Sequence, residues 1–394
     1  MFHFTATPPL SLYLHIPWCV RKCPYCDFNS HEARGDIPEA GYIAALLADL
    51  EQQLPSVWGR TVESVFIGGG TPSLFSAHGI EQLLNELRAR ITLKPGAEIT
   101  LEANPGTVDQ ARFTGFRQAG INRLSMGIQS FQDTLLTAIG RIHDGREART
   151  AFEAARHAGF ENINLDLMFG LPGQSTALAM QDLEQAIALR PEHLSWYELT
   201  IEPNTWFYQH PPTRPDDATR WTMQTEGQTR LEQAGYHRYE VSAFATDGRQ
   251  CRHNLNYWQF GDYLGIGAGA HAKISDAAGQ SITRTARLRH PRRYIDAAAT
   301  AKCIDVTTTL SPGDAILEYI MNGLRLDAGF SAGEFTASTG LPYAMIEARI
   351  RQALQANWLV LEDERIRTTD RGQRYLDEFL QQWLPESSRH AETY

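Results

Sequence analysis

Cys19, Cys23 and Cys26 lie within eight positions, in the pattern C-x3-C-x2-C. In a reducing compartment such a cluster favours binding an inorganic centre over forming disulfides. A structural zinc site needs four ligands, so the simplest alternative is a Cys3His site completed by His15 or His31. Three thiolates on a [4Fe–4S] cube instead leave one iron open, which suits a cluster that acts on a bound molecule. We therefore predict a [4Fe–4S] cluster held by the three cysteines.

Other candidate residues stand where short apolar runs end. The segment 68–72, Gly-Gly-Gly-Thr-Pro, follows one run, and Glu102 ends the next. A glycine run alone is a weak signal, because turns use glycine without any ligand. After a parallel strand, however, backbone without a Cβ lets a ligand approach closely. A carboxylate at a strand's carboxyl end faces the edge where ligands of parallel sheets bind. Gln129 holds a comparable place after the fourth run, and Asp166 lies within the fifth.

The elements that must position these residues alternate between short strands and longer helices. Strands are predicted at 12–16, 64–67, 98–102, 123–128, 162–168 and 193–199. Amphipathic helices are predicted at 39–54, 79–91, 108–119 and 146–158. Brief apolar runs bounded by Gly, Pro or Asn indicate strands. Repeated β/α units predict a parallel sheet with helices outside, either an open doubly wound sheet or a full or partial barrel.

A different pattern begins after an Arg- and Pro-bearing stretch at 287–293, which we interpret as a linker. Three helices, a two-stranded hairpin and a closing helix are predicted, at 312–326, 331–340, 342–356, 358–362 with 365–368, and 370–384. This order resembles a winged helix, so we predict two domains, 1–290 and 305–394. DNA binding is not expected, because the helix that would read DNA offers only Arg349 and Arg351.

Composition is that of an ordinary globular protein, with 42% hydrophobic and 21% charged residues in 394. It excludes disorder and small disulfide-stapled scaffolds. The net charge of −10 disfavours nonspecific nucleic-acid binding. No run approaches the 18 or so apolar residues that span a membrane, and the first residues do not resemble a signal peptide. We therefore expect a cytoplasmic protein without a transmembrane segment.

The cysteine pattern directly after the first strand resembles the hallmark of the radical S-adenosylmethionine (SAM) superfamily. The resemblance implies a partial (β/α)6 barrel in which the amino and carboxylate groups of SAM chelate the open iron. It also implies a set of residues that hold SAM: Tyr13, Gly69, Gly70, Thr71, Glu102, Gln129, Arg141 and Asp166. Pairing of Asp166 with Arg141 would offset the cost of burying that carboxylate.

The resemblance extends to one group of the superfamily, which contains oxygen-independent coproporphyrinogen III oxidases and haem chaperones. Segments 13–19, 127–131 and 166–172 carry it, and it covers nearly the whole chain. Phe28 stands where the oxidases carry a further cysteine, and only 12 residues precede Tyr13, where the oxidases have a long extension. The resemblance therefore implies a haem chaperone that binds the cluster, SAM and haem and transfers haem to an acceptor protein. The alternative is the oxidase, which decarboxylates propionate side chains.

The segment 253–258, His-Asn-Leu-Asn-Tyr-Trp, matches an HNxxYW motif that the resemblance associates with haem. Imidazole is a usual axial ligand of haem iron, and aromatic rings pack on porphyrins. His253, Tyr257 and Trp258 are thus candidate haem contacts, and His271 is a secondary candidate for SAM or haem. The alternative is a polar turn before a strand, with the aromatic rings in the core. The implied partners are haem, an acceptor such as a respiratory-chain protein, and an electron donor such as a flavodoxin.

Overall fold

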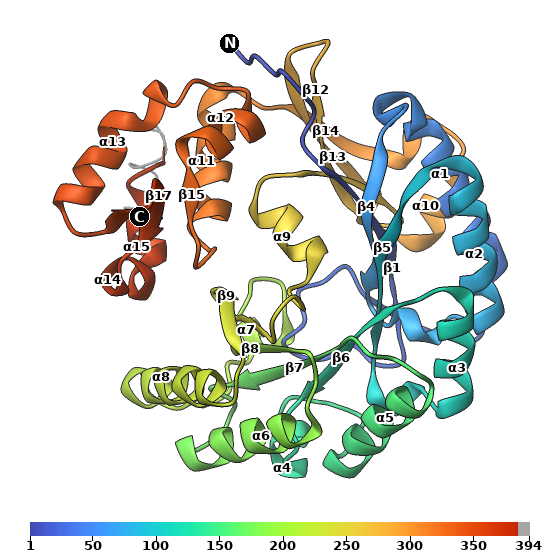
Figure 1. The fold of residues 1–394 in the computed structure, drawn as a ribbon. Coiled ribbons are helices and arrows are strands. Elements are labelled where there is room, and N and C mark those ends of the chain that lie inside the picture. Colours follow the sequence, from blue (N-terminus) through green and yellow to red (C-terminus); the bar gives the residue numbers. More distant parts are fainter. Residues whose placement is uncertain (385–394) are drawn as a thin grey trace.

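The computed structural model describes residues 1–384. Its main feature is a curved sheet with helices on the outer side and a smaller unit facing the open side (Figure 1). Parallel strands form the middle of the sheet: β1 (Leu10–Ile16), β4 (Thr61–Gly69), β5 (Thr92–Ala103), β6 (Arg123–Gln129), β7 (Ile163–Phe169) and β8 (His193–Glu198). All six strands expected from the sequence are present. The sheet is curved but does not close, so the architecture is a partial barrel.

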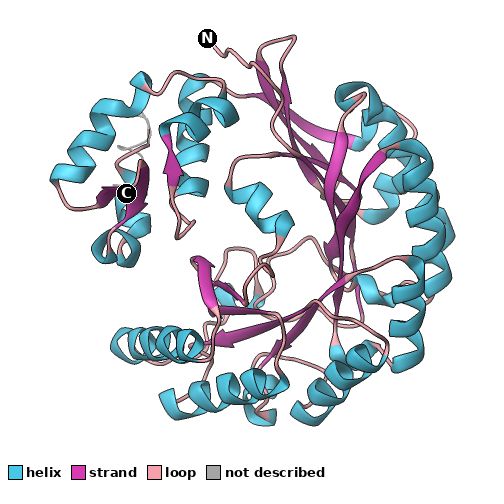
Figure 2. Ribbon diagram, in the orientation of Figure 1, coloured by secondary structure: helices cyan, strands magenta, loops and turns pink. Residues whose placement is uncertain are grey.

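Helices between these strands cover the outer face of the sheet (Figure 2). They are α1 (Glu39–Gln53), α2 (Ala77–Arg90), α3 (Gln110–Ala119), α4 (Asp133–Ala138), α5 (Gly145–His157), α6 (Thr176–Leu189) and, after β8, α8 (Asp217–Gln233). The short helix α7 (Trp206–Gln209) lies within the curve instead (Figure 1), where the Phe207 N–H donates to the Pro24 carbonyl of the cysteine loop. Local sequence fixes where several begin. Ser76 accepts a hydrogen bond from the Gly79 N–H at the start of α2, and Asp144 and Glu147 form a capping box on α5.

Side chains alternate between the two faces along each middle strand. One face is apolar and packs against the helices, as Leu124 and Met126 of β6 do. The other face is largely polar and includes Ser125 of β6, Asn164 of β7 and Ser195 of β8. Parallel strands covered by helices are usually apolar on both faces. A polar inner face therefore indicates that the barrel encloses a polar cavity instead of a packed core.

The sheet extends beyond the six parallel strands at both edges. Next to β1 lie β11 (Asp262–Ile266), which is parallel, and the antiparallel strands β12 (His271–Asp276), β13 (Ser281–Arg287) and β14 (Ile304–Thr309). Next to β8 lie β10 (Ala243–Ala245) and β9 (His237–Glu240). A short separate pair, β2 (Trp18–Cys19) and β3 (His31–Glu32), flanks the cysteine segment.

The linker interpretation of 287–293 is wrong. Arg287 ends β13, is fully buried and forms an ion pair with Asp49 at 3.0 Å. Pro291 begins the helix α10 (Pro291–Ala297), where its fixed φ and missing N–H are tolerated. The sheet then continues through β14 to Thr309. The division into two domains stays a prediction.

The C-terminal unit has the element order of a winged helix. It comprises α11 (Pro312–Gly323), β15 (Phe330–Ser331), α12 (Ala332–Thr339), α13 (Ala344–Gln355), β16 (Leu359–Glu362) and β17 (Arg365–Thr368). The predicted closing helix is two helices, α14 (Asp370–Arg374) and α15 (Leu376–Gln381), because the backbone at Tyr375 is not helical. Phe4 and Phe260 belong to the hydrophobic core of this unit, so it packs against the sheet portion.

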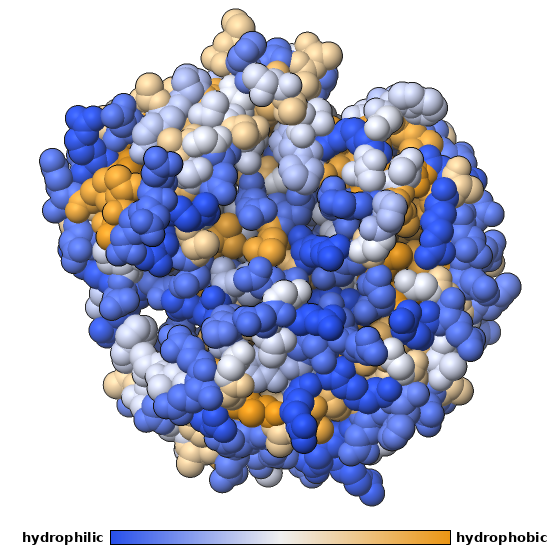
Figure 3. Space-filling model, in the orientation of Figure 1, coloured by the Kyte–Doolittle hydropathy of each residue, from blue (hydrophilic) through white to orange (hydrophobic). Residues whose placement is uncertain are grey.

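Residues 253–258 belong to α9 (Arg252–Trp258), which lies inside the curve of the sheet and contacts β1, β4 and α11 (Figure 1). The segment is therefore a helix and not the polar turn of the alternative interpretation, whose other part, aromatic rings packed in the core, fits Tyr257 against Tyr263. The face of the molecule seen in Figure 3 is mostly hydrophilic, with hydrophobic side chains gathered in separate patches. Within residues 1–384, no helix has the length and apolar character needed to cross a bilayer.

Candidate functional site

A cavity of about 520 Å³ lies inside the partial barrel. Its wall is formed by the cysteine loop after β1, the inner face of β4 to β8, and α9. It brings together most of the residues proposed from the sequence: Cys19, Cys23, Cys26, Gly69, Gly70, Thr71, Glu102, Gln129, Arg141, Asp166 and Trp258. Four candidates do not line it: Tyr13, His253, Tyr257 and His271.

The cysteine loop is held in a compact turn at the cavity. The Cys26 N–H donates to the Cys23 carbonyl at 3.1 Å, and Cys26 Sγ lies 3.7 Å from Ser30 Oγ. Burial, together with the two neighbouring cysteines, raises the pKa of the Cys19 thiol to about 11. Arg141 Nη1 donates to Cys23 Sγ at 3.6 Å. A cationic centre would compensate this burial, because ligating cysteines bind as thiolates.

The donor set fits an iron–sulfur cluster better than a single ion. Within residues 1–384, no three His, Cys, Asp or Glu side chains converge closely enough to hold one metal ion. Both ring nitrogens of His15 are engaged, at 2.8 Å from the Asn29 carbonyl and 2.9 Å from the Tyr13 hydroxyl. His31 keeps a buried, unpartnered Nε2 and packs against the ring of His290, but within residues 1–384 it belongs to no group of three metal-ligating side chains. The Cys3His alternative therefore lacks a fourth ligand, whereas three thiols beside an open cavity suit a cluster with one open iron.

The glycine segment passes directly beside the cysteine loop. Gly69 has φ +120°, which L side chains rarely adopt, and its N–H donates to Glu102 Oε2 at 2.9 Å. A Cβ on Gly70 would lie 2.6 Å from the Trp18 carbonyl oxygen and 3.0 Å from Cys19 Sγ. Only glycine lets the backbone come this close to the thiol. The segment thus forms a cradle for a ligand bound next to the cysteines.

Two carboxyl groups face the cavity, Glu102 from β5 and Asp166 from β7, on either side of β6. Burial, together with the nearby Asp166, raises the pKa of Glu102 to about 8. Burial also raises the pKa of Asp166, which accepts hydrogen bonds from Asn164 Nδ2 at 2.8 Å and Ser125 Oγ at 3.2 Å. Perturbed carboxyl groups in a cavity are typical of functional sites.

The expected pairing of Asp166 with Arg141 is wrong. Arg141 instead donates to the Gly127 carbonyl oxygen at 2.6 Å and to Cys23 Sγ. The reason is an irregularity of β6 between Gly127 and Gln129, where the pairing register with β7 shifts. The bulge frees the Gly127 carbonyl from the ladder and makes it an acceptor for the guanidinium.

Gln129 sits at the same irregularity in a strained conformation. Its φ is +68°, which is uncommon for a residue with a side chain. Its Oε1 accepts a hydrogen bond from the Tyr197 hydroxyl at 2.7 Å. Such strain costs about 1–3 kcal/mol and concentrates at ligand sites, where the surrounding structure enforces it.

Helix α9 divides the HNxxYW segment between two faces. Asn254 and Trp258, four residues apart, line the cavity. His253 and Tyr257 pack on the sheet instead, with the His253 ring centroid 4.9 Å from Phe66 and the Tyr257 ring 4.9 Å from Tyr263. Burial lowers the pKa of His253 to about 4, so its imidazole is neutral near pH 7.

The two remaining candidates lie outside the cavity. Tyr13 stands behind the cavity wall, with its ring centroid 6.2 Å from both Phe66 and His253. His271 is exposed at the start of β12. Sequence reasoning missed other cavity residues, including Arg123 and His193. The signal for them was present, because polar residues alternate with apolar ones along β6 and β8.

Known proteins share both parts of the chain. The family model described as Radical SAM superfamily matches residues 13–186, and the HemN C-terminal domain model matches 310–375. The chain is 48% identical to the heme chaperone HemW of Haemophilus influenzae and 47% identical to that of Escherichia coli, over 96% of this chain and 99% of each relative. A mouse protein, radical S-adenosyl methionine domain-containing protein 1, mitochondrial, is 35% identical over 97% of this chain and 89% of its own length.

A solved structure shares the whole fold. Coproporphyrinogen III oxidase (HemN) from Escherichia coli, described as a radical SAM enzyme, superposes with a TM-score of 0.80 at 23% identity, covering 96% of this chain and 90% of that chain. This likeness confirms the fold expected from the sequence, including the C-terminal unit. Together with the identity to the curated relatives along nearly their full length, it leads to one assignment: the chain belongs to the HemW family of the radical SAM superfamily.

Proposed function

We propose that the protein is a haem chaperone, which holds a [4Fe–4S] cluster and SAM, binds haem, and passes haem to an acceptor protein such as a respiratory-chain component. The observation that carries the proposal is one cavity shared by three cysteines, the glycine cradle and α9. The name heme chaperone, borne by relatives with 47–48% identity, supports the haem part.

In this proposal the cysteine loop binds the cluster and the inner face of the barrel binds SAM. The Gly69–Gly70–Thr71 backbone allows close approach, and Glu102 has a carboxylate oxygen beyond the one bound to the Gly69 N–H. Gln129, Arg141 and Asp166 complete the wall, and Tyr13 supports it from behind Phe66. When bound, the cluster supplies an electron and SAM supplies a sulfonium that an electron can cleave. An external donor such as a flavodoxin would reduce the cluster.

For haem, α9 offers an aromatic wall and an imidazole. Trp258 lines the cavity, and Tyr257 packs edge-on against it at 5.3 Å. His253 is partly exposed, and its buried Nδ1 has no hydrogen-bond partner within residues 1–384. A neutral imidazole is the form that ligates haem iron. His253 is therefore the proposed axial ligand, with exposed His271 as the second candidate.

The cluster is tested by anaerobic reconstitution. We expect about four iron atoms per chain by metal analysis, as a [4Fe–4S] cluster requires. Cys23→Ala should abolish the broad visible absorption of the cluster. Cys303→Ala is the matched control, because Cys303 is equally free but buried against Asp49, and it should leave the absorption unchanged. Retention of the cluster in the Cys23 variant, or one zinc per chain, would contradict the ligand assignment.

The haem function is tested in the same sample by titration with haem and measurement of the Soret band. His253→Ala should weaken uptake or change the ligation spectrum, whereas His78→Ala, at an exposed position on α2, should not. Deoxyadenosine is measured in parallel.

Incubation with coproporphyrinogen III, SAM and a reductant tests the oxidase alternative, and protoporphyrinogen formation at an enzyme-like rate would overturn the chaperone proposal.

A further inference from the structure

Arg123 is a buried cation that faces the cavity without a partner. It begins β6 on the inner face of the barrel, lines the cavity and is only 1% exposed. Among residues 1–384 its side chain makes no hydrogen bond or ion pair, and its Nε is buried and unsatisfied. A guanidinium cannot lose its charge in a protein. Nearby acidic groups act on it only through space, so its donors face the cavity without a hydrogen-bond acceptor, which indicates that something else binds there.

The nearest acidic groups are held by other donors. Glu98 Oε1 accepts hydrogen bonds from the first turn of α9, at 3.0 Å from the Arg252 N–H and 3.4 Å from the His253 N–H. Asp166 is occupied by Asn164 and Ser125. Both carboxyl groups influence Arg123 through space, but neither forms an ion pair with it. The donor face of the guanidinium is therefore left for a ligand.

A second unpaired donor lines the same cavity from α9. The Trp258 Nε1–H is buried and has no acceptor within the described chain. An indole N–H and a guanidinium both donate and cannot accept hydrogen bonds. The cavity wall also holds two buried acceptors without a hydrogen bond, Glu240 Oε2 and Asn104 Oδ1, but within residues 1–384 neither is bonded to Arg123 or Trp258. The planar fork of arginine matches a carboxylate in bidentate geometry.

We propose that this part of the cavity, between Arg123 on β6 and Trp258 on α9, is a subsite for a carboxylate of the ligand. The identity of that ligand rests on the proposed function, in which haem supplies the carboxylate as one of its propionates. The carboxylate of SAM is a different group, because in the family it chelates the cluster. The subsite thus orients haem by an acidic side chain, independently of the axial ligand to its iron.

The test compares the affinities of the wild type and of Arg123 variants for two ligands. Wild type and Arg123→Gln are titrated with haem and with haem dimethyl ester, whose propionates carry no charge. Because a charge-assisted hydrogen bond is lost, wild type should bind haem roughly ten- to hundredfold more tightly than the diester. Arg123→Gln should bind the two ligands alike. Arg123→Lys, which keeps the charge but not the fork, should retain part of the preference.

Two results would overturn the subsite. Equal binding of haem and diester by wild type would show that no carboxylate is recognised. An equal loss of affinity for both ligands in Arg123→Gln would show a merely structural role. SAM affinity should stay unchanged in the variant, since the carboxylate of SAM is bound elsewhere.

A second measurement separates the subsite from the haem function. Acetate, compared with chloride at equal ionic strength, should raise the melting temperature of ligand-free wild type more than that of Arg123→Gln. If wild type binds neither porphyrin yet shows this acetate effect, the haem function fails and the subsite stands. If acetate protects both proteins equally, the subsite is refuted.

The ligand-free variant should melt at or above the wild-type temperature, because no ion pair is broken. A large fall in its melting temperature would contradict the unpaired state of Arg123.

Discussion

Lys273 and Arg123 are both cations buried to about 1% exposure, yet their surroundings are opposite. Lys273 Nζ donates to three acceptors: the Phe260 carbonyl at 2.7 Å, Asp262 Oδ1 at 3.0 Å and Ser275 Oγ at 3.4 Å. Arg123 has none among the described residues. A buried charge whose partners lie within the chain belongs to the fold. A buried charge without them indicates a ligand.

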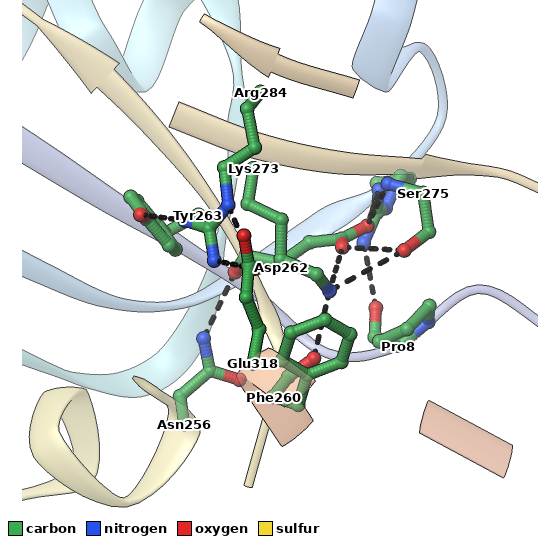
Figure 4. Close-up of polar contacts among 10 residues, drawn as sticks. Pro8, Asn256, Phe260, Asp262, Tyr263, Lys273, Ser275, Arg284 and Glu318 are labelled. Atoms are coloured by element: carbon green, nitrogen blue, oxygen red, sulfur yellow. Dashed lines mark hydrogen bonds and ion pairs between the residues drawn. The ribbon is translucent and has the colours of Figure 1, made fainter. Parts of the chain in front are cut away.

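The Lys273 network is closed around Asp262 (Figure 4). Asp262 accepts from Arg60 Nη1 at 2.7 Å and from the Ser275 N–H at 2.9 Å, in addition to Lys273. Arg60 also donates to the Pro8 carbonyl at 2.6 Å. The network therefore joins the N-terminal segment, β11 and β12 beside the turn that follows α9. Every charge in it has a direct counter-charge.

The largest expected effect is loss of stability when this network is broken. Lys273→Met removes one of the two cations paired with the buried Asp262 and leaves the Phe260 carbonyl without its donor, which should lower the free energy of unfolding by about 2–4 kcal/mol. Lys94→Met is the matched control, because Lys94 pairs with Glu63 at a half-exposed site and its loss should cost about 1 kcal/mol or less. Urea unfolding of the ligand-free proteins, followed by circular dichroism, measures both. Similar losses in the two variants would remove the distinction between closed network and surface pair.

A smaller change in stability, which depends on pH, is expected from the carboxyl group of Glu102. The folded pKa is about 8, above the ordinary value of 4.5, so the fold favours the protonated form. The stabilisation is complete below pH 4.5 and is lost as pH rises towards 8. Wild type should therefore lose stability relative to Glu102→Gln between pH 5 and pH 8. We expect a total of about 1–2 kcal/mol, less than the full shift implies, because the side chain keeps partial exposure to the cavity.

Urea unfolding at several pH values measures the difference between wild type and Glu102→Gln. Glu153→Gln, at an exposed position of α5, serves as the control, and its difference from wild type should not change over the same range. A Glu102 difference that is flat with pH, or that shrinks as pH rises, would show that the carboxyl group is not held in its protonated form.

Features with local signatures could be predicted from the sequence. The six strands were recognisable because each is a short apolar run with turn residues at its ends. The cysteine loop and the glycine segment were recognisable by spacing alone. In the structure a Cβ added to Gly70 would lie 3.0 Å from Cys19 Sγ, so the two segments pass directly beside each other. Glu102 and Gln129 were found because the carboxyl ends of parallel strands share one edge, where both line the cavity.

Features that depend on distant partners could not be predicted. The Arg- and Pro-bearing stretch around Arg287 resembles a linker. Its burial depends on an ion pair with Asp49, which lies more than 200 positions away in the chain. The face that α9 turns to the cavity is another such feature: Glu98 accepts hydrogen bonds at the N-terminus of α9, and Asn254 and Trp258 line the cavity while His253 packs on Phe66. A haem-ligand role for His253 stays a proposal. The alternation along β6 places Arg123 on the inner face, but its lack of a hydrogen-bonding partner depends on residues distant in the chain and could not be predicted.

The smallest change in the free energy of unfolding is expected for a buried neutral group, the Thr100 hydroxyl. Thr100 of β5 pairs in register with Arg123, is fully buried, and its hydroxyl has no partner within residues 1–384. Thr100→Val should therefore leave the unfolding free energy unchanged or raise it by up to about 1 kcal/mol, because no hydrogen bond is lost. Ser11→Ala removes a hydroxyl that lies 2.8 Å from Ser64 Oγ and should cost about 1–3 kcal/mol. Urea unfolding of both variants decides the matter. If Thr100→Val costs as much as Ser11→Ala, then the Thr100 hydroxyl is paired in solution, and water inside the cavity would satisfy the inner face without any ligand.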